Sequence, residues 1–423
     1  MDDSAYRYRW SDEVSIMETS RYMNSSGLHV GYVLARYPVL SETFIAREIL
    51  ELQNRGVRIS IYAFGADTLS TPHEILSRIS APIIYLPSHH RRRTITAAFL
   101  YWMVRRPRSL LAALRGAGST EALRATLGAL YLAYEARKDP PNHLHVHFIS
   151  SPSAAAWAVA RLLGISFSVT AHAHDIFLTP QTEIKRRIEQ AVWIRTISRF
   201  NRRKLRSIAP KESAKIEVIR AGIDPERFPF EPNEINIDEP LHLVSVGRLV
   251  EIKGMDTLIN GVSRLTDIDW RLSIAGDGPL KTSLKSCALK KGISTRIAWL
   301  GPQSEYAISE LLSNADIFIL ASKRDRAGNM DGIPVVLMEA LSRGVPVIST
   351  SISGIPELLG GGAGIVLSPD SPESIANAIR SLRDDSSIAT RMKQRGRARI
   401  ERGYDIRRTT GFLLSRFSRF MNS

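Results

Sequence analysis

Two positively charged side chains stand where a phosphate could bind. Arg248 lies at the end of an apolar run of strand length (241–249), and Lys253 follows it, just before residues with a helical period. A helix N-terminus offers free backbone N–H groups and the positive end of the helix dipole, and both reinforce side-chain cations in binding a pyrophosphate. The pair is therefore a candidate pyrophosphate site, although taken alone it favours the alternative, two solvated surface cations.

Two carboxylates eight residues apart form a second candidate site. Asp331 belongs to a loop, Asp331-Gly332-Ile333-Pro334, and Glu339 lies two turns into the helix predicted to follow it. Such a pair can accept hydrogen bonds from two parts of one polyol, for instance the sugar and the ribose of a nucleotide sugar. The alternative is a helix with a buried glutamate, although buried acids are rare unless they are paired.

Histidines form a third candidate. His172 and Asp175 lie in the segment SVTAHAHD at the end of a predicted strand. An unperturbed imidazole titrates near neutrality and suits a hydrogen-bonding role in a reaction, but a satisfied core histidine is the alternative. His143, His145 and His147 alternate along another predicted strand, a spacing that could ligate a metal; no further ligand clusters with them, and we expect no metal.

Two other patterns are discounted. Asp267 and Asp269 spell the Asp-x-Asp of metal-dependent GT-A transferases, but they lie in a turn before a strand and the rest of that fold is missing. Ser198 lacks the glycines of a nucleophile elbow, so we expect it to cap the following helix.

The elements that must position these residues alternate between apolar runs of strand length and longer segments with helical period. This alternation is typical of parallel sheets built from βαβ units. Strands are predicted at residues 28–35, 57–64, 143–149, 166–173, 192–198 and 215–222, and again at 241–249, 271–278, 295–301, 315–322, 346–350 and 364–368. A helix is predicted over 41–56, N-capped by Ser41 and closed by Gly56.

This pattern predicts two consecutive doubly wound domains, 27–222 and 241–405. Residues 223–240 contain four prolines and indicate a linker, and residues 406–423 form a C-terminal helix that could pack back on the first domain. Two such domains would bring the carboxyl ends of both sheets to one cleft, where open α/β sheets bind ligands. Residues 1–26 are interpreted as a poorly ordered extension, or as upstream sequence that a start at Met23 would omit.

Composition narrows the class of protein. The 423 residues are 44% hydrophobic and 23% charged, which excludes collagen-like, coiled-coil and wholly disordered chains. Cys287 is the single cysteine, so no intramolecular disulfide can form, and a reducing, cytoplasmic compartment is favoured. No run reaches the ~18 apolar residues of a membrane span, and the first residues do not resemble a signal peptide.

The net charge of +15 requires an acidic partner to be considered. Arginines are most concentrated between Arg78 and Arg124, where the mostly apolar stretch 94–104 separates Arg91–Arg93 from Arg105–Arg106. With Tyr101 and Trp102 near one end, this segment suits a helix lying in an anionic membrane surface; a core helix with a solvated basic rim is the equal alternative. Nucleic acid is not expected as a partner, because no binding motif accompanies the charge.

Taken in order, the motifs resemble a known family. Gly-Arg-Leu (247–249) with Lys253-Gly254, then Gly-Asp-Gly-Pro (276–279), then an acid with Glu eight positions on in Pro-Val-Val-Leu-Met-Glu-Ala, are similar to the retaining, nucleotide-sugar-dependent glycosyltransferases of family 4 (group 1). These have the two-Rossmann-domain architecture called GT-B. The similarity covers nearly the whole chain from about residue 27. The segments RYPVLSETFIAREILEL and HLHVHFISSPSAAAWAVARLLGISFSVTAHAHDIF are similar to the subgroup that assembles bacterial exopolysaccharides such as colanic acid.

The resemblance implies a role for each matching residue. Asp331 stands where the family usually has Glu, which shortens the side chain by one methylene. Implied donor ligands are Arg248 and Lys253 for the diphosphate, Glu339 for the ribose, Asp331 with the backbone N–H groups of Gly332 and Ile333 for the sugar, and the turn glycines Gly276 and Gly278. Implied on the acceptor side are Ser41, Thr43, His147 and Asp175. His172 is implied near the anomeric carbon and completes a catalytic set with Asp331 and Glu339.

The expected function is transfer of a hexose, with retention, from a nucleotide diphosphate sugar to a polyprenyl-linked or other glycan at the inner face of the plasma membrane. No cofactor or metal is expected, because cations and a helix N-terminus can stabilise the leaving diphosphate. Two alternatives stay open: a nucleotide-sugar 2-epimerase of the same fold, and a catalytically inactive nucleotide-sugar-binding protein, which the Asp331 departure keeps under consideration.

Overall fold

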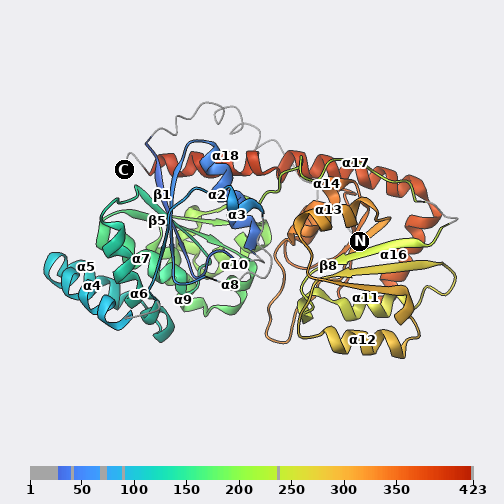
Figure 1. The fold of residues 1–423 in the computed structure, drawn as a ribbon, viewed down its shortest axis with the longest axis horizontal. Helices are drawn as coiled ribbons and strands as arrows, with labels where there is room; N and C mark the ends of the chain where they lie inside the picture. The colour runs from blue at the N-terminus through green and yellow to red at the C-terminus, as the bar shows by residue number, and fades with distance from the viewer. Residues whose placement is uncertain (1–26, 40–41, 67–73, 88–90, 236–238, 421–423) are drawn as a thin grey trace. The chain divides into compact units, whose positions relative to one another are not determined.

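The computed structural model describes residues 27–39, 42–66, 74–87, 91–235 and 239–420. The chain divides into two compact units. In the described part, the first unit runs to Ala221 and includes residues from Ile406 onward, and the second comprises Gly222–Asp405 (Figure 1).

The first unit is built on a seven-stranded parallel sheet with the strand order β3-β2-β1-β4-β5-β6-β7. Its strands are β1 (His29–Leu34), β2 (Arg58–Ala63), β3 (Ile83–Tyr85), β4 (His143–His147), β5 (Ser166–Ala171), β6 (Trp193–Thr196) and β7 (Ile216–Val218). Its α-helices are α2 (Thr43–Asn54), α3 (Glu74–Ser77), α4 (Arg91–Arg105), α5 (Pro107–Arg115), α6 (Thr120–Ala136), α7 (Ser151–Leu163), α8 (Ala173–Leu178), α9 (Gln181–Gln190), α10 (Arg199–Ile208) and α18 (Ile406–Arg419).

The second unit contains a six-stranded parallel sheet with the order β10-β9-β8-β11-β12-β13. Its strands are β8 (Leu241–Val246), β9 (Trp270–Ala275), β10 (Ile297–Gly301), β11 (Ile317–Leu320), β12 (Val347–Thr350) and β13 (Ile365–Leu367). Its α-helices are α11 (Met255–Val262), α12 (Lys281–Lys290), α13 (Glu305–Ser313), α14 (Val335–Arg343), α15 (Ile355–Leu359), α16 (Pro372–Asp384) and α17 (Ser386–Gly403).

The doubly wound α/β class expected from the sequence pattern is confirmed. All twelve predicted strands are present, and their interiors are largely buried, because helices cover both faces of a parallel sheet. The edge strand β3 was not predicted. It has only three residues, lies between Pro82 and Pro87, and is half exposed, so it lacks the long apolar run that indicates an inner strand.

The last helix, α18, returns to the first unit. Leu413, Leu414 and Phe417 are buried in a cluster with residues of β1, β2 and α2. The Arg55 guanidinium donates to the carbonyl of Arg407, and Arg416 pairs with Glu217 at 2.7 Å. The C-terminal residues therefore complete the core of the unit that the N-terminal half begins.

The described residues of the segment expected to be a linker are attached to the second unit. Residues 223–235 contain no helix or extended strand, but Phe228 is fully buried and its carbonyl accepts from the Ser342 hydroxyl of α14 at 2.9 Å. The backbone N–H of Glu231 donates to the carbonyl of Arg343 at 3.1 Å. These contacts explain why the division between units falls at residue 222, before the proline-rich segment.

The basic apolar segment forms α4, which packs on α6 and is followed by α5 at the periphery of the first unit (Figure 1). Of the two alternatives for this segment, the burial of Trp102 favours a core helix with a basic rim. Trp102 is 3% exposed, and its indole N–H donates to the carbonyl of Leu130 at 3.0 Å, because this side of α4 faces the core. Among the described residues, no helix is long and apolar enough to cross a membrane.

Candidate active site

Each sheet reverses its winding direction once, between β1 and β4 in the first unit and between β8 and β11 in the second. Ligands of open α/β sheets bind at the carboxyl ends of the strands beside such a switch point. The structure places Arg248 and Lys253 after β8, and Asp331 after β11. In the first unit, His147 ends β4 and His172 directly follows β5. Apolar runs in the sequence had predicted these strands, and the family resemblance had pointed to the two histidines.

Close packing of two loops explains the glycines Gly276 and Gly278. Gly276 has a φ of +134°, and a Cβ atom there would lie 2.0 Å from the carbonyl oxygen of Gly247. A Cβ on Gly278 would lie 2.6 Å from the carbonyl oxygen of Leu249. The turn after β9 can therefore pack against the loop that carries Arg248 only because Gly276 and Gly278 have no side chains.

Lys253 and Asp331 are in direct contact, which the sequence did not indicate. The Lys253 ammonium lies 2.8 Å from Oδ1 and 3.0 Å from Oδ2 of Asp331, and the Ser322 hydroxyl donates to Oδ2 at 2.9 Å. The two charged side chains are only 15% and 12% exposed, so water screens them weakly. The shortened acid thus contacts the cation expected to bind phosphate.

The other residues expected to bind the donor lie close to Lys253 or Asp331 in the sequence. The Arg248 side chain is exposed, and within the described residues its guanidinium makes no hydrogen bond or ion pair. Gly332 and Ile333 directly precede Pro334, the N-cap of α14. Glu339 lies in the second turn of that helix and is 6% exposed. Arg248 is thus an exposed cation in the loop that precedes α11, and a cation near a helix N-terminus can attract an anionic ligand.

Lys323, at the same edge, was missed by the sequence analysis. It follows β11, and its ammonium lies 2.8 Å from Asp256 Oδ2 and 3.3 Å from Asp370 Oδ1. Burial alone would lower the pKa of Lys323, but the two carboxylates outweigh it and the pKa is raised. The lysine stays charged and adds a cation to those of Arg248 and Lys253 at this edge.

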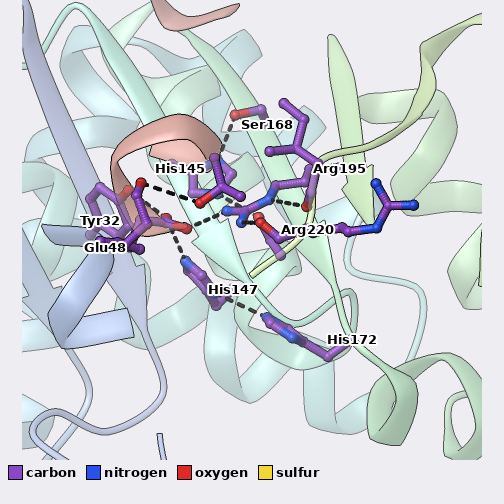
Figure 2. Close-up of polar contacts among 12 residues, drawn as sticks. Tyr32, Glu48, His145, His147, Ser168, His172, Arg195 and Arg220 are labelled. Carbon is purple, nitrogen blue, oxygen red and sulfur yellow. Dashed lines mark hydrogen bonds and ion pairs between the residues drawn. The ribbon is translucent and has the colours of Figure 1, made fainter. Parts of the chain in front are cut away.

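Figure 2 shows a buried polar network in the first unit that joins five elements. Glu48 of α2 accepts a hydrogen bond from the Tyr32 hydroxyl at 2.8 Å and contacts Nε2 of His147 at 3.2 Å through the same oxygen. Its other oxygen pairs with the Arg195 guanidinium. Nδ1 of His147 lies 3.0 Å from Nε2 of His172. The sequence analysis identified the two histidines but not Tyr32, Glu48 or Arg195.

The electrostatics of the network follow from burial and charge. Burial would raise the pKa of Glu48, but the nearby Arg195 and His147 outweigh it and hold that pKa well below its usual value. Burial lowers the pKa of His172 well below 6.5, and the Arg195 guanidinium acts in the same direction. Glu48 is therefore an anion and His172 a neutral imidazole at neutral pH.

Aromatic rings surround the imidazole of His172. The ring centroids of Phe44 and Phe148 each lie 4.9 Å from that of His172, which is 8% exposed. Phe148 has a φ of +76°, a conformation that is unfavourable for a bulky residue. The backbone after β4 thus adopts a costly geometry that brings the Phe148 ring against His172.

The alternating histidines of β4 have different partners. His143 bonds to the hydroxyls of Ser166 and Ser168, and burial lowers its pKa to about 3. His145 bonds to Ser168 and Thr170 at 2.8 Å each. Ligand atoms of His145, His147 and Glu48 lie within 4.8 Å of one another, so the set has the spacing of a metal site. Hydrogen bonds within the protein already engage all three residues.

The structure gives Asp175 an anchoring task. One carboxylate oxygen accepts from the backbone N–H of His172 at 2.9 Å and the other from that of Ile149, and Asp175 is 2% exposed. Burial raises the pKa of Asp175 to about 7, against the backbone hydrogen bonds that lower it. This carboxylate links the loops after β4 and β5. Thr43 is the half-buried first residue of α2, and Ser41 lies outside the described residues.

The residues of the two discounted patterns, Asp267 with Asp269 and Ser198, interact with other residues of the structure. Asp267 and Asp269 lie before β9, at the amino ends of the strands, where they pair with Arg380 at 2.8 Å and Arg296 at 3.3 Å. The prediction that Ser198 caps a helix is confirmed, because its hydroxyl accepts from the backbone N–H of Asn201 at the start of α10.

Comparison with known proteins identifies the class. The model of Glycosyltransferase Family 4 matches residues 41–227, and that of Glycosyl transferases group 1 matches residues 228–399. The chain belongs to these glycosyltransferases, as its motifs had indicated. The Escherichia coli protein WcaL, named as a colanic acid biosynthesis glycosyltransferase, is 28% identical over 366 residues, which cover 78% of this chain and 84% of WcaL.

A second relative agrees with this assignment, and two solved structures share the fold. The amylovoran biosynthesis glycosyltransferase AmsK of Erwinia amylovora is 29% identical over 77% of this chain and 83% of its own. Anabaena Alr3699/HepE, solved with UDP and glucose, gives a TM-score of 0.71 at 14% identity and covers 93% of this chain and all of that one. A glycosyltransferase of Rickettsia africae gives 0.70 at 15% identity, covering 94% and 99%. The fold is GT-B.

The close approach at Gly254 yields a stability prediction. Gly254 connects Lys253 to α11 with a φ of +60°, and a Cβ there would lie 1.8 Å from the carbonyl oxygen of Ala321. We expect Gly254→Ala to lower the free energy of unfolding by about 3 kcal/mol, since backbone strain and a steric clash add. Gly292→Ala is the control: its φ is +71° with nothing within 4 Å, so we expect about 1 kcal/mol. Urea unfolding measures both, and equal losses would contradict the close approach.

Proposed function

We propose that this glycosyltransferase moves a hexose from a nucleotide diphosphate sugar to a glycan acceptor, with retention at the anomeric carbon. One observation carries the donor assignment: an exposed arginine and a partly buried lysine follow β8 at the switch point of the second sheet, and the lysine lies just before α11 and contacts Asp331. Cations and helix N–H groups placed together suit a diphosphate. Asp331 and Glu339 would then take sugar and ribose hydroxyls.

The proposed step breaks the bond between the anomeric carbon and the terminal phosphate oxygen, and forms a bond from the same carbon to the acceptor oxygen. The acceptor hydroxyl gives its proton to the departing phosphate oxygen, so charges and atoms balance. Negative charge grows on the diphosphate as it leaves, and Arg248, Lys253 and the α11 N-terminus would stabilise it. His172 would lie near the anomeric carbon.

The acceptor and the pathway are inferred from the relatives. WcaL and AmsK are named for colanic acid and amylovoran biosynthesis, which supports an exopolysaccharide or a related glycan as the product. Their names are those of transferases, which favours transfer over epimerisation of the donor. A polyprenyl-linked oligosaccharide is the proposed acceptor, since it would lie at a membrane surface.

Replacing Lys253 tests the donor site. We expect Lys253→Ala to reduce turnover by at least about tenfold and to weaken nucleotide binding, because one of the cations facing the leaving diphosphate is lost. Calorimetric titration with UDP, GDP and ADP sugars identifies the donor and then compares its affinity for both proteins. Arg380→Ala, which removes an ion pair at the amino ends of the strands, is the control and should bind normally. An unchanged donor affinity in Lys253→Ala would argue against the site.

Metal dependence provides a second test. If side-chain cations and the helix N-terminus carry the charge of the leaving group, treatment with EDTA should leave sugar transfer within about twofold of the untreated rate. Turnover is measured before chelation, after it, and after adding back Mg²⁺ or Mn²⁺. A loss that either ion restores would overturn this assignment of roles.

An apolar and basic surface on α4 and α5 supports membrane binding. Val104 is 77% exposed, and Leu100, Met103 and Leu111 are 46–50% exposed. Exposed arginines flank them at positions 92, 93, 105, 106 and 108. Exposed apolar side chains among cations suit the headgroup region of an anionic bilayer. We propose that this surface holds the enzyme at the membrane while the core side of α4 packs on α6.

Flotation with liposomes tests this surface. The wild-type protein should float with vesicles that contain anionic lipid, and a variant with Arg92, Arg93, Arg105 and Arg106 changed to Gln should stay in the soluble fraction. Val104→Asp should also reduce binding, whereas Leu289→Asp, which changes a leucine that is 68% exposed on α12, should not. Equal flotation of the wild-type protein and the Arg→Gln variant would contradict the proposed surface.

A further inference from the structure

The hydrogen bonds between Glu48, His147 and His172 have a direction that the chemistry of the groups determines. A carboxylate only accepts, so the shared oxygen of Glu48 takes hydrogens from the Tyr32 hydroxyl and from Nε2 of His147. Arg195 already balances the charge of Glu48. A second buried positive charge on His147 would have no further anion in this network, so His147 is neutral and its Nδ1 accepts.

The acceptor role of His147 determines which ring nitrogen of His172 carries the hydrogen. Because Nδ1 of His147 is an acceptor, Nε2 of His172 must donate across the 3.0 Å separation. The hydrogen of His172 then sits on Nε2, and its Nδ1 keeps a lone pair. The hydrogen bonds therefore run in one direction, from His172 through His147 to the ionised carboxylate of Glu48. All three residues are at most 8% exposed.

We propose that Glu48 and His147 are positioning residues that hold His172 as a neutral imidazole with its hydrogen on Nε2. This inference rests on the proposed function, in which His172 lies near the anomeric carbon. That carbon gains positive charge as the diphosphate departs, so an imidazolium beside it would raise the barrier, and a neutral ring polarised toward Glu48 would lower it. A second histidine linked to a carboxylate fixes both the tautomer and the ring orientation.

A metal ion held by Glu48, His145 and His147 is the competing explanation for the same cluster. The contacts disfavour it. One oxygen of Glu48 faces the Arg195 guanidinium, which would repel a cation, and both ring nitrogens of His145 are engaged by Ser168 and Thr170. A metal would have to replace these hydrogen bonds and sit beside a buried positive charge.

Steady-state kinetics of His147→Gln and Glu48→Gln test the proposal. We expect kcat to fall by at least about tenfold and the KM for the donor to change by less than about twofold, because other residues in the second unit bind the diphosphate. His143→Gln is the matched control: it lies on the same strand, is equally buried and bonds only to serines among its hydrogen-bonding partners in the described residues. It should keep kcat within about twofold. An equal loss in all three variants would reduce the network to a structural role and overturn the proposal.

Nuclear magnetic resonance of the wild-type enzyme gives an answer that does not depend on variants that fold poorly. With ¹⁵N-labelled histidine, the couplings between ring nitrogens and ring protons distinguish the two tautomers, and the spectrum of His172→Gln assigns the signal among ten histidines. We expect the Nε2–H tautomer for His172 at pH 7, and its loss in His147→Gln. A hydrogen on Nδ1, an imidazolium, or one equivalent of tightly bound metal that His145→Gln removes would overturn the proposal.

These measurements separate the two levels of inference. If the wild-type enzyme transfers sugar from none of the donors, the proposed function fails, while the tautomer of His172 still decides whether Glu48 and His147 position it. If transfer is observed and the tautomer is Nδ1–H, only the positioning role fails.

Discussion

A buried ion needs a partner, and this requirement organises the carboxyl edge of the sheet in the first unit. Removing a carboxylate from water costs several kcal/mol unless opposite charge and hydrogen bonds replace the lost hydration. Glu48 meets this condition only because Tyr32 of β1, His147 of β4 and Arg195 of β6 converge on it. Arg195 in turn donates to the carbonyls of Ile219 and Arg220. One side chain thus ties α2 to three strands and to the end of the first unit.

The second unit uses the same physics with less burial. Lys253 and Asp331 remain partly exposed, and Arg248 is solvated, so this edge can accept a charged ligand without first breaking a fully buried pair. The loops that carry these residues pack closely through Gly254, Gly276 and Gly278. The first unit therefore presents a rigid neutral imidazole, and the second unit presents cations and carboxylates that a ligand can reach.

The sequence held signals for part of what the structure revealed. In α2, Ile45, Glu48, Ile49 and Leu52 share one face by helical period, so the burial of Glu48 could have been anticipated. Arg195 lies two residues after Trp193 on a strand that is buried on both faces, so its burial could have been anticipated in the same way. Neither pattern names a partner. Trp102 is the opposite case: flanking arginines suggested an interface, but the position of α4 against α6 buried it.

The sequence by itself determined the doubly wound α/β class, the twelve main strands and the glycosyltransferase family. Hydrophobic period and short motifs are local properties, so they can be recognised in the sequence without knowledge of the fold. The loops bearing Arg248, Lys253, Asp331 and His172, and the strand that carries His147, could be located in the sequence for the same reason. Only the tertiary structure decided that Lys253 contacts Asp331, that Asp175 bonds to the backbone of both His172 and Ile149, and that Glu48 reaches His172 through His147. Those contacts join residues as many as 99 positions apart, and their geometry depends on how strands and helices pack rather than on any spacing along the chain.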